Sequence, residues 1–267
     1  MDGVGVRAEG FGLRGPRGWA FRGVDVDAEP GSLIAIQGPS GSGRTSLLLA
    51  LTGRMKATEG TATVGTARLP KQAAAVRRIS ALAHVAGVTD LDPALTVGEH
   101  LRERALLERR FAGSVRELLR PRAEKAEETR RRADAALAAA GLAPEALPKG
   151  SRTAVRDLER LEALRLSVAL ALVSRPRLLG VDDADLKLSQ AERADVHALF
   201  RSLTEAGTTV VTVCGEAPEG AITVSTHATD HETTGGNAGG ADDTVGPTDE
   251  NADKEDTADA LAETRRA

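Results

Sequence analysis

The stretch that decides the fold reads Gly38-Pro39-Ser40-Gly41-Ser42-Gly43-Arg44-Thr45 and is followed by Ser46. It comes after the apolar run 32–37 and before the helix-like run 46–51, so a strand, a glycine-rich turn and a helix start follow one another directly. Glycines at this spacing allow successive backbone N–H groups to converge on phosphate oxygens at the positive end of a helix. We therefore predict that Gly38 to Ser46 form a phosphate-binding loop.

One position departs from the loop pattern G-x-x-x-x-G-K-[ST], because Arg44 stands where lysine is expected. A compact ammonium group is not replaced like for like by a broad, planar guanidinium. We expect Arg44 to make a weaker or differently placed phosphate contact. The alternative at this point is a glycine-rich turn that binds no ligand.

Composition limits the class of protein. The chain has 267 residues, 41% of them hydrophobic and 28% charged, with a net charge of -4. This is enough for one sizeable domain plus an appendage, and arginines scattered among acids are typical of solvated helix faces rather than of a nucleic-acid-binding stripe. We expect no nucleic-acid partner.

The single cysteine, Cys214, excludes an internal disulfide, and a reducing, cytoplasmic setting fits. The first residues lack a basic region followed by an apolar core, and no stretch approaches the ~20 apolar residues that a transmembrane helix needs. We expect no direct membrane span, so that any role at a membrane comes through a partner.

The composition and hydrophobic pattern of the sequence change three times along the chain. Residues 4–69 carry short apolar runs separated by glycine, which predicts strands around the loop, whereas residues 93–175 are rich in Ala, Leu, Glu and Arg, which predicts helices. Alternation of strands and helices then returns, with predicted strands at 177–183, which ends in two acids, and at 208–214. Residues 225–267 contain no aromatic residue and many acids, so we expect a disordered acidic tail.

Two capping boxes mark expected helix starts. Thr96 with Glu99 and Ser189 with Glu192 both place a hydroxyl three residues before a carboxylate. The helix after Ser189 has apolar residues at helical spacing and should end at Gly207.

The order of loop, helical block and acid-ended strand resembles the nucleotide-binding domain of ATP-binding cassette (ABC) transporters. The most specific matches are the loop itself, the helix entry at Leu95–Leu101 and the segment Leu166–Leu179. The resemblance implies an α/β fold of the P-loop NTPase class, with a central, mostly parallel sheet, an N-terminal antiparallel β subdomain and an inserted helical subdomain. It places an ABC-type nucleotide-binding domain at residues 1–224, with the helical subdomain at about 90–165.

The resemblance also implies cofactors, partners and location. ATP and Mg²⁺ are the expected cofactors. A membrane permease subunit is the expected partner, together with a second ABC domain in a homo- or heterodimer. The protein should then lie at the inner face of the cell membrane through that partner.

Carried over position by position, the resemblance gives roles to four residues. Thr45 and Asp182 take the positions of the Mg²⁺ ligands. Asp183 takes the position of the catalytic glutamate but is one methylene shorter, and a misplacement of that size can cost ~10²-fold in rate. His84 takes the position of the Q-loop glutamine, which in the family follows an Ile-x-x-x-x pattern that begins here at Ile79. We therefore assign Asp183 and His84 as candidate catalytic residues; the alternatives are a solvated strand end for the two aspartates and an incidental surface histidine for His84.

Three further motifs of the family differ in this sequence. The switch histidine falls on Gly215, which has no side chain to contact a γ-phosphate. The signature motif aligns with 158–162, where Glu159 and Glu162 would repel phosphate, and residues 157–166 have the composition of an uninterrupted helix. The D-loop aligns with 186–189, where only a leucine is shared.

Two functions remain open on these grounds. One is an ATP-binding subunit that energises a separate permease, with hydrolysis weak or lost. The other is a non-catalytic regulatory or scaffold module that acts through a membrane partner or a competent ABC partner. An unliganded structural domain is a third, simpler reading. Trp19 adds a smaller alternative, since it either stacks on adenine or serves only as core.

Overall fold

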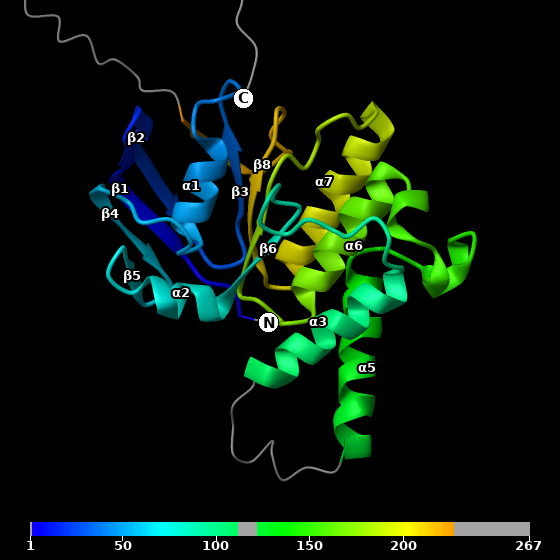
Figure 1. Cartoon of the computed structure of the whole chain (residues 1–267). Helices are drawn as coiled ribbons and strands as arrows, with labels where there is room; N and C mark the ends of the chain where they lie inside the picture. Colours follow the sequence, from blue (N-terminus) through cyan, green and yellow to red (C-terminus); the bar gives the residue numbers. More distant parts are fainter. Residues whose placement is uncertain (1, 112–121, 227–267) are drawn as a thin grey trace, which may run out of the picture. The chain divides into compact units, whose positions relative to one another are not determined.

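The computed structural model describes residues 2–111 and 122–226, and these form a single unit of two sheets and their helices (Figure 1). The remaining residues lie outside the described part, and with them the predicted acidic tail. The domain boundary at residue 224 therefore stays a prediction.

The N-terminal region forms an antiparallel sheet. Its strands are β1 (Val6–Gly15), β2 (Gly18–Ala28), β4 (Glu59–Val64) and β5 (Ala67–Leu69), in the order β2-β1-β4-β5. The strands alternate between buried and exposed residues, which is typical of a sheet with one face on the core.

The second sheet is parallel and holds the loop. Its order is β6-β7-β8-β3-β9, with bounds β3 (Leu33–Gln37), β6 (Ser80–Ala83), β7 (Leu178–Val181), β8 (Thr209–Val213) and β9 (Ile222–Ser225). Strands β6, β7 and β8 are buried at every position, as expected when both faces of a parallel sheet are covered.

Successive residues of this sheet enter two different cores. Leu178 and Val211 belong to the core shared with the antiparallel sheet and α1 (Arg44–Leu51), whereas Leu179 and Val210 belong to the core under the helices of the other face. A Cβ on Gly180 would lie 2.7 Å from Leu82 Cδ2 and 3.0 Å from Leu48 Cδ1. Glycine at this position therefore lets α1 pack directly against the sheet.

Besides α1, the described chain contains five further α-helices. They are α2 (Ala73–Ile79), α3 (Val97–Phe111), α5 (Arg122–Ala139), α6 (Arg160–Leu172) and α7 (Gln190–Glu205), with short 3₁₀ turns at Pro144–Ala146, Gly150–Arg152 and Val155–Asp157. Of these, α3, α5 and α6 fall within residues 93–175, which the sequence predicts to be helical. Figure 1 shows α3, α5, α6 and α7 on the face of the parallel sheet opposite to α1. None of the described helices is both long and apolar enough to cross a bilayer.

Both predicted capping boxes are confirmed. Thr96 N–H donates to Glu99 at 2.8 Å, and Ser189 N–H donates to Glu192 at 2.7 Å. The fold class is confirmed as well, because an antiparallel sheet, a parallel sheet and an inserted set of helices are all present.

Candidate functional site

The predicted phosphate loop connects the end of β3 to the start of α1. Its tip, Pro39 to Gly41, is exposed, and its base is half-buried. Gly43 is the N-cap of α1 with φ 83°, and a Cβ there would collide with the carbonyl group of Ala20. The first turn of α1 contains no acidic residue and its N-cap makes no side-chain hydrogen bond, so the N-terminal N–H groups are free of side-chain competitors.

The loop is fastened from the far end of the described chain. The hydroxyl groups of Ser42 and Thr226 are hydrogen-bonded at 2.5 Å, and Thr226 N–H donates to the Gln37 carbonyl at 3.0 Å. A Cβ on Gly38 would meet the Thr226 hydroxyl, so this residue also requires glycine. Sequence reasoning missed Thr226, because no motif connects a residue after β9 to the loop.

Thr45 and Asp182 lie together behind the loop. The Thr45 hydroxyl donates to Asp182 Oδ2 at 2.8 Å. Asp182 is only 3% exposed, and its buried Oδ1 atom has no hydrogen-bond partner among the described residues. The alternative of a solvated strand end is therefore wrong for Asp182.

Burial raises the pKa of Asp182, and the hydrogen bond from Thr45 acts in the opposite direction. A buried carboxylate oxygen without a partner beside a hydroxyl is a donor set that suits Mg²⁺, which prefers oxygen ligands. The residues present therefore fit the predicted cation, with Thr45 and Asp182 as the groups that would hold it.

Arg44 points from the first turn of α1 toward the second aspartate. Its Nη2 atom lies 3.9 Å from Asp183 Oδ1, and the two side chains are 20% and 42% exposed. Asp183 itself has φ 43°, a left-handed backbone conformation that residues other than glycine rarely adopt. The structure thus brings the loop, the altered lysine position and the paired aspartates into one site.

His84 directly follows β6 and lies near the paired aspartates, whose charges act on it. It is half-buried with φ 55°, and its N–H donates to Ser167 Oγ on α6 at 2.7 Å. Burial lowers the pKa of His84, the charge of Arg160 lowers it further, and the carboxylates of Asp183 and Asp182 oppose this. The histidine is therefore neutral at pH 7. Sequence reasoning missed Ser167, although a single polar residue within the apolar run 166–173 was the available signal.

The segment after β8 is held by the segment after β7. Asp185 Oδ2 accepts from Gly215 N–H at 2.7 Å and from Glu216 N–H at 3.1 Å. The Gln37 side chain donates to the Gly215 carbonyl at 2.9 Å. The side chains of Asp185 and Gln37 thus hold the backbone at Gly215, the switch position, but this position has no side chain to present to a phosphate.

The signature segment differs from the prediction. The expected uninterrupted helix over 157–166 is wrong, because α6 begins at Arg160 with Glu159 as its N-cap. Glu159 N–H donates to Glu162 Oε2 at 2.8 Å, which completes a capping box at this end. The segment therefore does form a helix N-terminus, and the two predicted carboxylates stand on it.

Trp19 lies on β2 next to Ala20, whose carbonyl contacts the loop. Its ring is flanked by the guanidinium groups of Arg22 at 4.6 Å and Arg14 at 5.6 Å, and the residue is 36% exposed. This exposure is not that of a core residue, so the reading of Trp19 as simple core is wrong.

Comparison with known proteins adds the family. The family model "ABC transporter" matches residues 21–185. The L-cystine transport system ATP-binding protein TcyN of Escherichia coli (strain K12) is 31% identical over 206 residues, which cover 73% of this chain and 74% of the relative. The phosphonates import ATP-binding protein PhnC of Thiobacillus denitrificans is 28% identical, with 74% and 73% covered.

Solved structures show the same fold. The ATP-binding cassette MJ0796, solved as a dimer bound to ADP and Pi, superposes with a TM-score of 0.60 at 24% identity and covers 79% of this chain and 88% of its own. The ATP-binding cassette MJ1267 superposes with a TM-score of 0.63 at 19% identity, with 80% and 82% covered.

Proposed function

Because the chain belongs to the ABC transporter family, we propose that it binds ATP and Mg²⁺ through residues 38–46 and couples to a separate membrane permease, with hydrolysis weak or lost. The observation that carries the proposal is the Thr45–Asp182 hydrogen bond of 2.8 Å at the uncapped start of α1. It joins the loop to the acid-ended strand at the point where a polyphosphate and its cation are expected.

Binding would use mainly the backbone. The N–H groups of the loop and of the first turn of α1 would supply an anion site that depends more on glycine geometry than on residue 44. Thr45 and Asp182 would hold Mg²⁺, which neutralises charge on the terminal phosphates when bound. Trp19, half-exposed beside Ala20, offers a flat surface for the adenine ring.

Several features of the site support slow hydrolysis. Asp183 is shorter than the glutamate of the family, and Arg44 Nη2 lies 3.9 Å from its carboxylate, which draws the carboxylate toward α1. Gly215 offers no side chain to a phosphate, and burial lowers the pKa of His84, which favours its neutral form. Asp183 and His84 are the remaining side chains that could orient a water molecule. Neither has the same length as the glutamate or glutamine that the family has at its position.

Coupling to a permease would place the protein at the inner face of the cell membrane. Support comes from the family and from relatives whose names describe ATP-binding proteins of import and transport systems. The permease and a second ABC domain are therefore the proposed partners.

The second candidate is a non-catalytic module that pairs with a competent ABC domain. The start of α6 favours it, because Glu159 and Glu162 place negative charge where the family presents a helix N-terminus to the partner's nucleotide. A partner with intact motifs would then supply the active site, and this chain would respond to nucleotide by conformation.

Calorimetric titration of the full chain with ATP in the presence and absence of Mg²⁺ tests binding, and phosphate release tests turnover. We expect saturable heat that increases with Mg²⁺, and turnover well below the ~1–10³ s⁻¹ of ordinary enzymes. Absence of heat at millimolar ATP would contradict the binding proposal. Turnover within the ordinary range would contradict slow hydrolysis and exclude the non-catalytic module.

A further inference from the structure

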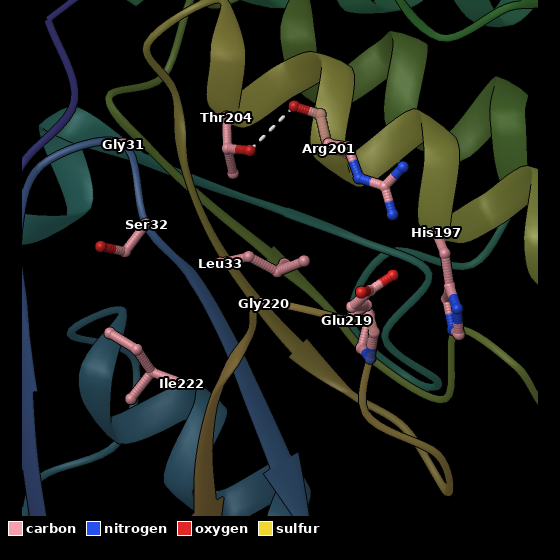
Figure 2. Close-up of a pocket in the computed structure, with 10 residues that line it drawn as sticks. Gly31, Ser32, Leu33, His197, Arg201, Thr204, Glu219, Gly220 and Ile222 are labelled. Carbon is pink, nitrogen blue, oxygen red and sulfur yellow. Dashed lines mark hydrogen bonds between the residues drawn. The ribbon is translucent and has the colours of Figure 1, made fainter.

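A second pocket lies away from the phosphate loop, at the opposite end of β3. Residues 214–221 alone connect the parallel strands β8 and β9, which lie on either side of β3. Connections between parallel strands ordinarily need about a dozen residues or more and contain a helix. A pocket of ≈ 360 Å³ lies here, lined by this loop, by α7 and by the start of β3 (Figure 2).

Unpartnered polar groups face this pocket from two elements. His197 and Arg201 lie one turn apart on α7, and Figure 2 shows the Arg201 guanidinium extended toward His197. The Nε2 atom of His197 is buried, so it does not open onto the pocket, and it has no hydrogen-bond partner in the described part of the chain. The Thr204 hydroxyl donates to the Arg201 carbonyl at 2.8 Å, but within residues 2–111 and 122–226 neither the Arg201 guanidinium nor the Glu219 carboxylate has a hydrogen bond or an ion pair.

The arrangement of charge and apolar surface defines a ligand class. Figure 2 shows the Glu219 carboxylate between Leu33 and His197, below Arg201. Arg201 and Glu219 carry opposite charges, so a dianion such as phosphate would meet a carboxylate as well as a guanidinium. A ligand with one anionic and one cationic group satisfies both. Leu33 and Ile222 supply an apolar wall for the rest of the molecule.

We propose that this pocket binds a small zwitterion of the α-amino acid class. The ligand carboxylate accepts hydrogen bonds from the Arg201 guanidinium, its ammonium group donates to Glu219, and its side chain lies on Leu33 and Ile222. The volume of ≈ 360 Å³ is at the lower end of the ~300–1,000 Å³ range of small-molecule sites, which suits a molecule of this size. The site is separate from the nucleotide site and does not depend on ATP binding.

The test is a titration of the ¹⁵N-labelled full chain with each standard amino acid in turn, followed through the amide signals of Ser32 and Gly220. We expect at least one amino acid to give saturable shifts at millimolar concentration, whether or not ATP is present. For that amino acid, the analogue without the ammonium group and the analogue without the carboxylate should each bind at least about tenfold more weakly.

Two variants complete the test. Arg201→Gln should lower the affinity at least about tenfold, while the matched control Arg17→Gln, in the exposed turn between β1 and β2, should leave it unchanged. The proposal is overturned if no amino acid gives saturable shifts at Ser32 or Gly220, or if Arg201→Gln binds as well as the control. It is equally overturned if inorganic phosphate binds there more tightly than every amino acid. Both variants should show the same thermal unfolding as the parent chain, because Arg201 and Arg17 are exposed; if Arg201→Gln is unstable, Glu219→Gln provides the same test.

Discussion

The starts of α1 and α6 are two helix N-termini that pack in the same way and differ in charge. Each helix buries an apolar face, through Leu47 and Leu48 in α1 and through Leu164 and Val168 in α6. At α1 no side chain caps the end and no acid lies in the first turn, whereas at α6 Glu159 and Glu162 occupy the end. Both ends carry the same partial positive charge from the peptide dipoles, but only the end of α1 leaves it available to an external anion. Packing therefore preserves the fold at both ends, and a few side chains decide which end can bind phosphate.

The largest expected effect comes from disrupting the backbone geometry at the start of α1. Gly43→Ala places a Cβ against the Ala20 carbonyl and forces an L side chain to φ 83°. We expect ATP affinity to fall more than ~100-fold and stability to fall by about 2–4 kcal/mol. Calorimetric titration and urea unfolding measure the two effects.

Gly41→Ala is the matched control. Gly41 has φ 82°, but a Cβ there meets nothing within 4 Å, so the cost should be limited to about 1–2 kcal/mol of backbone strain. Equal losses in the two variants would show that close approach of the loop to β2 is not what fixes its geometry.

The next effect in size concerns the cation at the α1 end. Asp182→Asn removes the buried charge and keeps an oxygen for the Thr45 hydroxyl. We expect the Mg²⁺-dependent part of ATP affinity to fall about 10–100-fold, while binding of ATP in EDTA is unchanged. If the variant keeps its Mg²⁺ dependence in the calorimeter, Asp182 is not at the cation.

Asp182 also gives a pH dependence with a definite sign. Because burial raises its pKa in the folded state, the folded chain favours the protonated acid, so this group stabilises the fold at low pH and loses that contribution as pH rises through the raised pKa. Without Mg²⁺, Asp182→Asn should therefore be more stable than the parent at pH 7, and the difference should vanish below the unfolded pKa of 3.8. Urea unfolding at both pH values measures it, and a larger difference at low pH would contradict the sign.

A smaller effect is expected from residue 44. Arg44→Lys replaces the guanidinium near Asp183 with a compact ammonium and should tighten ATP binding by about 3–10-fold. The control Arg54→Lys changes the same residue type at a position bonded to Ser80 rather than to the site, so its ATP affinity should not change. Unchanged affinity in Arg44→Lys would mean that residue 44 does not reach the phosphates.

The smallest expected effect concerns the negative charge at the start of α6. The double variant Glu159→Gln and Glu162→Gln removes its negative charge, and we expect ATP-dependent self-association to increase about 2–5-fold, with a loss of about 0.5–1 kcal/mol from the weaker cap. Glu192→Gln weakens the capping box of α7 in the same way and should change stability without changing association. Analytical ultracentrifugation with and without ATP separates the two outcomes; equal association of the double variant and the parent would show that these carboxylates do not limit pairing.

The sequence was sufficient where local chemistry determines structure. The glycine spacing of 38–43 predicts the loop because those backbone conformations have few alternatives, and hydroxyl–carboxylate pairs predict the starts of α3 and α7. It was insufficient where distant segments compete for the backbone. Residues 155–157 have good helix formers around them, but Val155 N–H donates to the Leu95 carbonyl at 2.9 Å and Arg156 N–H to the Pro93 carbonyl at 3.2 Å, so α6 starts only at Arg160.

The same limit applies to the site. Thr45 and Asp182 could be paired in advance because the family resemblance assigns both to one cation, and their contact is present. Ser167, Asp185 and Thr226 act through hydrogen bonds to backbone or hydroxyl groups of other segments, and a hydroxyl or carboxylate in a mixed sequence does not reveal its partner. The roles of Asp183 and His84 remain predictions that only kinetics can test.

The fastening of Ser42 by Thr226 spans 184 positions of the chain. During synthesis, the ribosome releases the loop long before it releases the residue that completes it. Strand β9 must also emerge before β3 acquires its second neighbour. A nascent chain that has not reached Thr226 therefore lacks the finished nucleotide pocket, however well its first half has folded, and translation itself sets the earliest moment at which ATP can act as a ligand that stabilises the fold.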